Sequence, residues 1–165
     1  MQYLALYSTT PILVVKDPRH RRDRPNNAYR FGVLYDGSDK AKKALVTTCK
    51  LMAKQDKLVV ITVNEDLVDE KNAHTQVQEI AAKFGVNSIE KVMLDHPKTL
   101  TVYQVIKQYL GSQASDEPGC ESDYIDFVAV GNSGLNFNAH DEPEYLGQVA
   151  GTVLRAKRMN CLFIP

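Results

Sequence analysis

The sequence lacks the cysteine and histidine patterns that mark metal and redox sites. Its three cysteines are an odd number at scattered positions, with no Cys-x-x-Cys pair. Its four histidines show no i, i+4 spacing and have no companion cysteine, which argues against a dedicated zinc site. Thiols distributed in this way fit a reducing compartment, so the sequence predicts a cytoplasmic protein.

Motifs of nucleotide-processing and hydrolytic enzymes are also missing. No Gly-x-x-x-x-Gly-Lys-Ser/Thr loop supports Walker-type phosphoryl transfer, and no Gly-x-Gly-x-x-Gly marks a dinucleotide site. A serine hydrolase needs Gly-x-Ser-x-Gly after a strand, whereas the triplet Asn132-Ser133-Gly134 has the wrong leading residue. The sequence therefore predicts ligand binding and switching, with at most slow ATP hydrolysis.

Charge and hydropathy argue against two classes of partner. Twenty basic and twenty acidic side chains cancel, so no global field draws the protein onto nucleic acid or an anionic membrane. No apolar run approaches the roughly 20 residues of a membrane-spanning helix, and no N-terminal leader pattern is visible. The basic stretch 17–27, interrupted by Pro18 and Pro25, predicts a solvated linker, with a nuclear signal or phosphate-binding patch as the alternative.

Short β-branched runs alternate with segments of helical period, which is typical of βαβ units in a parallel sheet. We expect strands at Ile12–Lys16, Phe31–Tyr35, Leu58–Asn64, Ile89–Leu94, Phe127–Val130 and Cys161–Ile164. We expect helices at about 41–52, 73–84, 101–110 and 144–158, with Gly85 and Gly111 ending the second and third. Lys40 and the other lysines around the first helix are expected mostly on its outer face.

Glycines near the end of one expected strand are the first candidate binding feature. Gly131 and Gly134 follow the strand at 127–130, and Gly147 precedes a helix whose free N–H groups can bind phosphate. In open α/β sheets, ligands bind beyond the carboxyl ends of the strands, where the strand order reverses. Ordinary tight turns, which also favour glycine, remain the alternative reading.

Asp36 is the second candidate, because it follows the strand at 31–35. Its carboxylate can accept hydrogen bonds from a ribose or adenine, or help to hold a metal ion. The same turn has a purely structural explanation, since Ser38 or Asp39 can be the N-cap of the following helix. The spacing alone does not separate the two readings.

Together these residues resemble the universal stress protein family. Its pattern is a strand ending in Asp-Gly-Ser, here at Asp36, and a late Gly-x-x-Gly, here Gly131 to Gly134, followed by Gly-Ser/Thr. The likeness covers most of the chain. It implies a Rossmann-like α/β fold of the adenine nucleotide alpha hydrolase type, with an open parallel sheet of five strands and helices on both faces. It also implies ATP or AMP binding in some members, with Mg accompanying the nucleotide, and frequent dimerisation.

The resemblance also implies particular nucleotide contacts. Asp36 matches the aspartate near the nucleotide, and Val63 matches a backbone contact to adenine. The ribose and phosphates are assigned to the turn Gly131, Ser133 and Gly134 and to the cradle Gly147, Gln148 and Val149. Two features depart from the family pattern: twelve residues separate Gly134 from Gly147, a longer loop, and Gln148 stands where Ser or Thr is expected.

The N-terminal segment resembles the closing helix and strand of such a domain. It aligns with the chain's own end, with Leu4 on Leu154 and Pro11 on Cys161. We therefore expect a tail and linker at 1–27, like the end of a preceding domain in a tandem array, and a universal stress protein domain at 28–165. The run Ile12–Lys16 is expected as an extra edge strand that can pair with the last strand, as a partner subunit's strand would in a homodimer.

The predicted function is that of a stress-response regulatory protein that binds ATP or a related adenine nucleotide. The main alternative is an interaction module that kept the fold and lost the nucleotide. A phospho-acceptor receiver domain is a further alternative, because Asp36 and Asp95 both follow expected strands.

Overall fold

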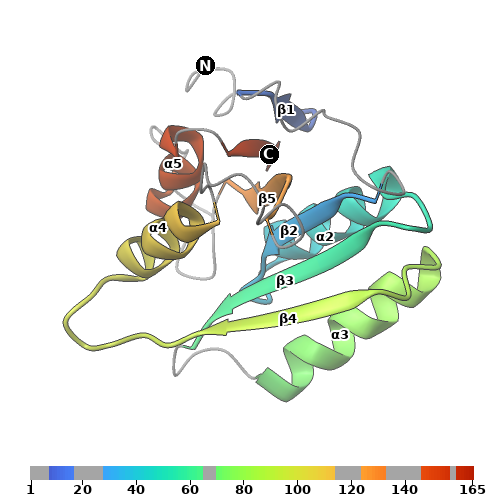
Figure 1. Ribbon diagram of the computed structural model, residues 1–165, viewed down its shortest axis with the longest axis horizontal. Helices are drawn as coiled ribbons and strands as arrows, with labels where there is room; N and C mark the ends of the chain where they lie inside the picture. Colours follow the sequence, from blue (N-terminus) through green and yellow to red (C-terminus); the bar gives the residue numbers. More distant parts are fainter. Residues whose placement is uncertain (1–7, 17–27, 65–69, 114–123, 133–145, 157–158) are drawn as a thin grey trace.

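The computed structural model describes residues 8–16, 28–64, 70–113, 124–132, 146–156 and 159–165. These residues form one six-stranded sheet with four helices (Figure 1). The strands are β1 (Ile12–Val14), β2 (Arg30–Leu34), β3 (Lys57–Val63), β4 (Ile89–Leu94), β5 (Phe127–Gly131) and β6 (Asn160–Ile164). The helices are α2 (Asp39–Leu51), α3 (Glu70–Lys83), α4 (Val102–Ser112) and α5 (Gln148–Arg155).

The strand order is β1-β6-β5-β2-β3-β4. Strands β2 to β6 pair in parallel, and β1 pairs with β6 in the antiparallel direction. The expected Rossmann-like sheet of five parallel strands with an additional N-terminal edge strand is therefore confirmed. The expected pairing of that edge strand with the last strand is also confirmed, and it occurs within one chain, with Leu13 opposite Leu162.

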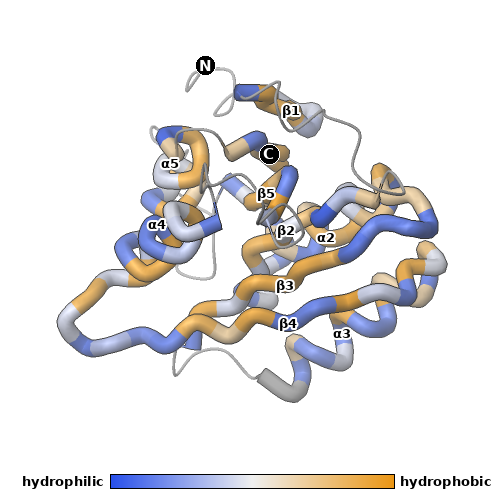
Figure 2. Tube along the Cα trace, in the orientation of Figure 1, coloured by the Kyte–Doolittle hydropathy of each residue, from blue (hydrophilic) through white to orange (hydrophobic). Residues whose placement is uncertain are grey.

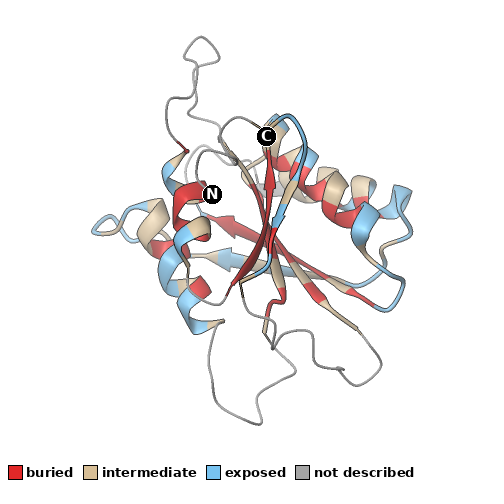
Figure 3. Ribbon diagram, turned by 90° about the horizontal axis from the view of Figure 1, so that it is seen from above, coloured by how far each residue is buried: buried red, intermediate tan, exposed pale blue. Residues whose placement is uncertain are grey.

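Helices cover both faces of the sheet (Figure 3). Helices α2 and α3 pack on one face through Leu45 and Val77, and α4 and α5 pack on the other through Ile106 and Val153. Hydrophobic residues concentrate on the central strands (Figure 2). Strand β3 is buried along six of its seven residues, as a strand covered on both faces requires, whereas the edge strand β4 has no fully buried residue.

Lys16 fastens the N-terminal strand to the rest of the sheet. Its backbone N–H donates to Asn160 Oδ1 at 2.8 Å, and its ammonium donates to the carbonyls of Val153 and Ala156, both at 2.9 Å. These carbonyls belong to the end of α5, where helix geometry leaves acceptors without partners inside the helix. One lysine therefore joins β1, β6 and the C-terminal end of α5.

Two expected helix boundaries differ from the structure. Gly85 follows α3 with φ +70°, as expected of a glycine that ends a helix. Gly111, expected in the same role, lies inside α4, because the helix continues to Ser112 and the N–H of Gln113 still bonds to the carbonyl of Tyr109. The helix expected from about residue 144 begins at Gln148, and residues 157–158 lie outside the described part.

An ion-pair cluster lies at the amino ends of the central strands. Arg30 donates to both carboxylate oxygens of Glu90, at 2.9 and 3.0 Å, and the Lys57 ammonium lies 2.6 Å from Glu90 Oε2. Burial raises the pKa of Glu90, but the hydrogen bond with Lys57 and the charges of Arg30 and Lys57 outweigh it, so the pKa lies below its usual value. The cluster joins β2, β3 and β4 far from the opposite edge of the sheet.

The Glu90→Gln variant should reveal this cluster in the pH dependence of stability. Because the pKa of Glu90 is lower in the folded state than the unfolded value of about 4.3, its contribution is present above that pH. It is lost as the pH falls through the folded-state pKa. The difference in unfolding free energy between wild type and variant, measured by urea denaturation, should therefore be largest near neutrality and shrink below about pH 4.

Glu79→Gln is the matched control, because Glu79 is exposed and makes no ion pair with any described residue. A difference between wild type and Glu90→Gln that stays the same from neutral to acidic pH would contradict the ion-pair account.

Candidate functional site

The strand order reverses at β2. From β2 the chain moves outward to β3 and β4, and it then returns to the other side of β2 as β5 and β6. The crossovers on either side of β2 therefore lead away from each other and leave a crevice at the carboxyl ends of β2 and β5. Asp36 follows β2 and Gly131 ends β5, so both lie at this switch point.

Gly131 lets helix α2 approach the end of β5. A Cβ placed on Gly131 would lie 2.6 Å from the Cβ of Lys40 and 3.1 Å from its carbonyl carbon. The first of these distances is shorter than atoms in contact allow, and the second is very tight. Glycine at this position is therefore explained by close packing against α2, which neither the ligand reading nor the tight-turn reading anticipated.

The two glycine segments meet in space. The N–H of Gly147 donates to the carbonyl of Asn132 at 3.2 Å, and the N–H of Asn132 donates to Ile164 at 3.0 Å. The residue after β5 is thereby bonded both to the end of β6 and to the N-cap of α5. This brings the N-terminus of α5 to the carboxyl edge of the sheet, beside the switch point.

Helix α5 presents free donors at this edge. Its first internal hydrogen bond runs from Gly151 to the carbonyl of Gly147, at 2.8 Å. The N–H groups of Gln148, Val149 and Ala150 precede this bond and have no acceptor among the described residues. Three amides at a helix N-terminus favour an anion through direct hydrogen bonds and the helix dipole.

Ser133 and Gly134, the other predicted members of the glycine turn, lie outside the described residues, as does the longer loop that follows them. The Gln148 side chain, in place of the expected Ser or Thr, is exposed.

Asp36 and Ser38 shape the turn between β2 and α2. Asp36 Oδ1 accepts a hydrogen bond from the N–H of Ser38 at 3.0 Å, and Gly37 between them has φ +82°. The Ser38 hydroxyl accepts from the N–H of Ala41 at 3.2 Å, so Ser38 is the N-cap of α2. The capping explanation of this turn is thus confirmed for Ser38, while Asp36 stays at the carboxyl edge of β2.

Val63 lies where β3 extends past its neighbour. The register pairs Leu34, the last residue of β2, with Ile61, so β3 continues to Val63 without β2 beside it. On its other side Val63 pairs with Leu94 of β4. The backbone of β3 at this point therefore faces the end of β2.

Lys40 is a site residue that the sequence reasoning missed. It was expected on the outer face of α2, but its Cβ lies against Gly131 and its side chain is partly buried. Because helical side chains lean toward the helix N-terminus, Lys40 extends toward the carboxyl edge of the sheet. Burial lowers the pKa of Lys40, the charge of Lys43 lowers it further, and the ammonium pairs with no described residue.

No protein-family model matches this sequence, and no curated protein matches it at the level of sequence. Among solved structures, a universal stress protein in complex with cAMP matches with a TM-score of 0.58 and 20% identity, over 82% of this chain and 95% of that chain. The chain therefore has the fold of a universal stress protein.

Two weaker similarities add nothing further about the fold. A protein from Mycobacterium tuberculosis H37Rv matches 53% of this chain and 66% of its own, at a TM-score of 0.41 and 15% identity. N,N'-diacetylchitobiose deacetylase from Pyrococcus horikoshii matches 83% of this chain and 55% of its own, at 0.37 and 16% identity.

The universal stress protein fold separates the two aspartates of the receiver alternative. Asp36 follows β2 and Asp95 follows β4, and β3 lies between these strands. No cluster of three or more His, Cys, Asp or Glu side chains among the described residues can hold a metal ion. None of the described helices has the length and hydrophobicity of a membrane-spanning segment.

The Gly131→Ala variant should destabilise the protein, because its methyl group must displace Lys40 and the first turn of α2. We expect a loss of about 1–3 kcal/mol in unfolding free energy, typical of overpacking, measured by urea denaturation. Gly111→Ala is the control, since nothing lies within 4 Å of an added Cβ there. It should be stabilising by about 0.5–1 kcal/mol, as expected for alanine in a helix. Equal effects of the two variants would contradict the packing role of Gly131.

Proposed function

We propose that this protein is a universal stress protein-like module that binds ATP, AMP or a related adenine nucleotide and acts as a regulatory binding protein. The observation that carries the proposal is the hydrogen bond from Gly147 to Asn132, which brings the free amides of α5 to the switch point between β2 and β5. The fold shared with a universal stress protein that was solved in complex with cAMP supports an adenine nucleotide as the ligand.

In this proposal, the phosphate accepts hydrogen bonds from the N–H groups of Gln148, Val149 and Ala150. Lys40, which has no acidic partner among the described residues, supplies positive charge from the opposite side of β5. Backbone donors suffice for this role, so the replacement of Ser or Thr by Gln148 removes a side-chain contact without removing the anion site.

The sugar and base occupy the remainder of the crevice. The ribose lies near Asp36 and Gly131, and adenine lies near the backbone of Val63, where β3 extends beyond β2. Ser133 and Gly134 complete the phosphate turn in this proposal. Any Mg²⁺ arrives with the phosphates, because the described residues offer no metal cluster of their own.

Cellular role and assembly form a further part of the proposal. We propose a cytoplasmic protein of the stress response, in keeping with Cys49 and Cys161, which are free and buried. Residues 1–27 derive, in this proposal, from the end of a preceding domain in a tandem array. Because β1 already covers β6, a homodimer would pair through the outer edge of β1, where Leu13 is 50% and Val15 41% exposed.

Calorimetric titration with ATP and AMP tests the nucleotide site. The Gly147→Val variant should lose binding, because its side chain would fill the space at the free amides. Its fold should persist, since φ −51° and ψ 149° at this residue are accessible to valine. Lys40→Met should weaken binding about tenfold, the value of one charged hydrogen bond.

Lys43→Met is the matched control for charge on the same helix, because Lys43 is exposed and has no partner among the described residues. Unchanged affinity in Gly147→Val would refute the phosphate placement. Absence of binding in the wild type would favour the alternative, an interaction module that works without a nucleotide.

A further inference from the structure

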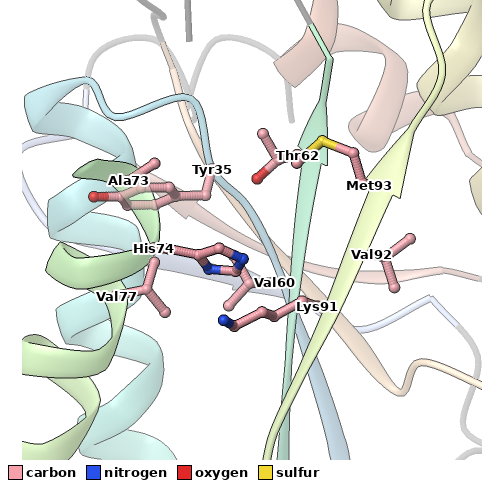
Figure 4. A pocket seen from close by; sticks show the side chains of 9 residues that line it. All are labelled: Tyr35, Val60, Thr62, Ala73, His74, Val77, Lys91, Val92 and Met93. Carbon is pink, nitrogen blue, oxygen red and sulfur yellow. The ribbon is translucent and has the colours of Figure 1, made fainter. Parts of the chain in front are cut away.

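A second recess lies away from the switch point, between α3 and the strands β3 and β4 (Figure 4). It measures about 430 Å³ and opens to solvent beside the edge strand β4. Its apolar lining includes Val60, Val77 and Met93. Recesses of this size with apolar walls and a few convergent polar groups are typical of small-molecule sites. None of the proposed nucleotide contacts lines it.

The polar side chains of this recess have no partners in the protein. The β3–β4 register pairs Val60 with Lys91 and Thr62 with Met93, so these four side chains share the face that α3 covers. Figure 4 shows the Thr62 hydroxyl, the His74 imidazole and the Lys91 ammonium around the same space. None of these three groups has a hydrogen-bond or ion-pair partner among the described residues.

Thr62 is the most informative of the three. Its side chain is almost fully enclosed, with 8% of the residue exposed. A hydroxyl removed from water without a hydrogen bond is destabilising, so a Thr at this buried position favours an occupant that can bond to it. Valine would fill the same volume without that cost, as it does at the neighbouring inward position, Val60.

The balance of charge and surface defines the occupant. Lys91 brings one positive charge, and no carboxylate lines the recess. Tyr35 contributes mainly its ring, because its hydroxyl already donates to Gln76 Oε1 at 3.1 Å. A single cation above apolar walls suits a monoanion with an apolar body, whereas a polyphosphate would need further positive groups.

We propose that this recess binds a small organic carboxylate. The carboxylate pairs with the Lys91 ammonium and bonds to the Thr62 hydroxyl and the His74 ring, while the apolar body packs against Val77 and Met93. The proposal does not depend on nucleotide binding at the switch point.

Methyl-detected NMR of the full chain tests the proposal with benzoate as the probe and benzamide as its uncharged counterpart. At concentrations up to roughly 10 mM, benzoate should shift the methyl signals of Thr62, Val77 and Met93 in a saturable manner. Benzamide should bind at least about tenfold more weakly, because it cannot form the charged hydrogen bond. Absence of shifts with benzoate, or equal affinity for the two probes, would overturn the proposal.

Variants of the lining give a second readout. Lys91→Met should weaken benzoate binding about tenfold or more, whereas Lys83→Met, at an exposed position of α3, should leave it unchanged. Thr62→Val should weaken benzoate binding and, without ligand, should raise the thermal midpoint, because it removes an unpaired buried hydroxyl. Equal benzoate affinity in Lys91→Met and Lys83→Met would overturn the proposal even if both variants fold normally.

Discussion

The contact between helix α2 and the end of strand β5 sets the geometry of the carboxyl edge of the sheet. The first turn of α2 lies so close to Gly131 that a single added methyl group would collide with Lys40. This close approach brings the Lys40 side chain to the point where the strand order reverses. One residue later, Asn132 bonds to β6 and to the N-cap of α5. Glycine at 131 therefore permits a helix start from each face of the sheet to meet at one crevice.

Helix α5 depends on contacts at both of its ends. It has eight residues, too short to be stable in isolation. At its N-terminus Gly147 bonds to Asn132, and beyond its C-terminal end Lys16 donates to the last carbonyls. The N-terminal strand, which lies more than 130 residues from α5 in the sequence, thus helps to hold the free amides of α5 in place. The extra strand is structurally connected to the proposed phosphate site.

The sequence predicts the strands well because their burial is a local property. Runs such as Val59-Val60-Ile61 are buried on both faces, and only a covered strand accommodates them. The end of α4 was wrong, because a glycine such as Gly111 is compatible with helical and left-handed backbone alike. The role of Lys40 escaped because it arises from a contact with Gly131, ninety-one residues away in the chain. The partnerless hydroxyl of Thr62 likewise becomes visible only when α3 is placed over β3.

The free amides of Gln148, Val149 and Ala150 are the centre of the proposed nucleotide site, and their NMR signals report on them directly. In a titration of the ¹⁵N-labelled protein, AMP should shift these three amide signals strongly, because its phosphate becomes their acceptor. Adenosine, which lacks the phosphate, should move them far less. Saturating AMP that leaves these signals in place, or adenosine that moves them equally, would contradict the account.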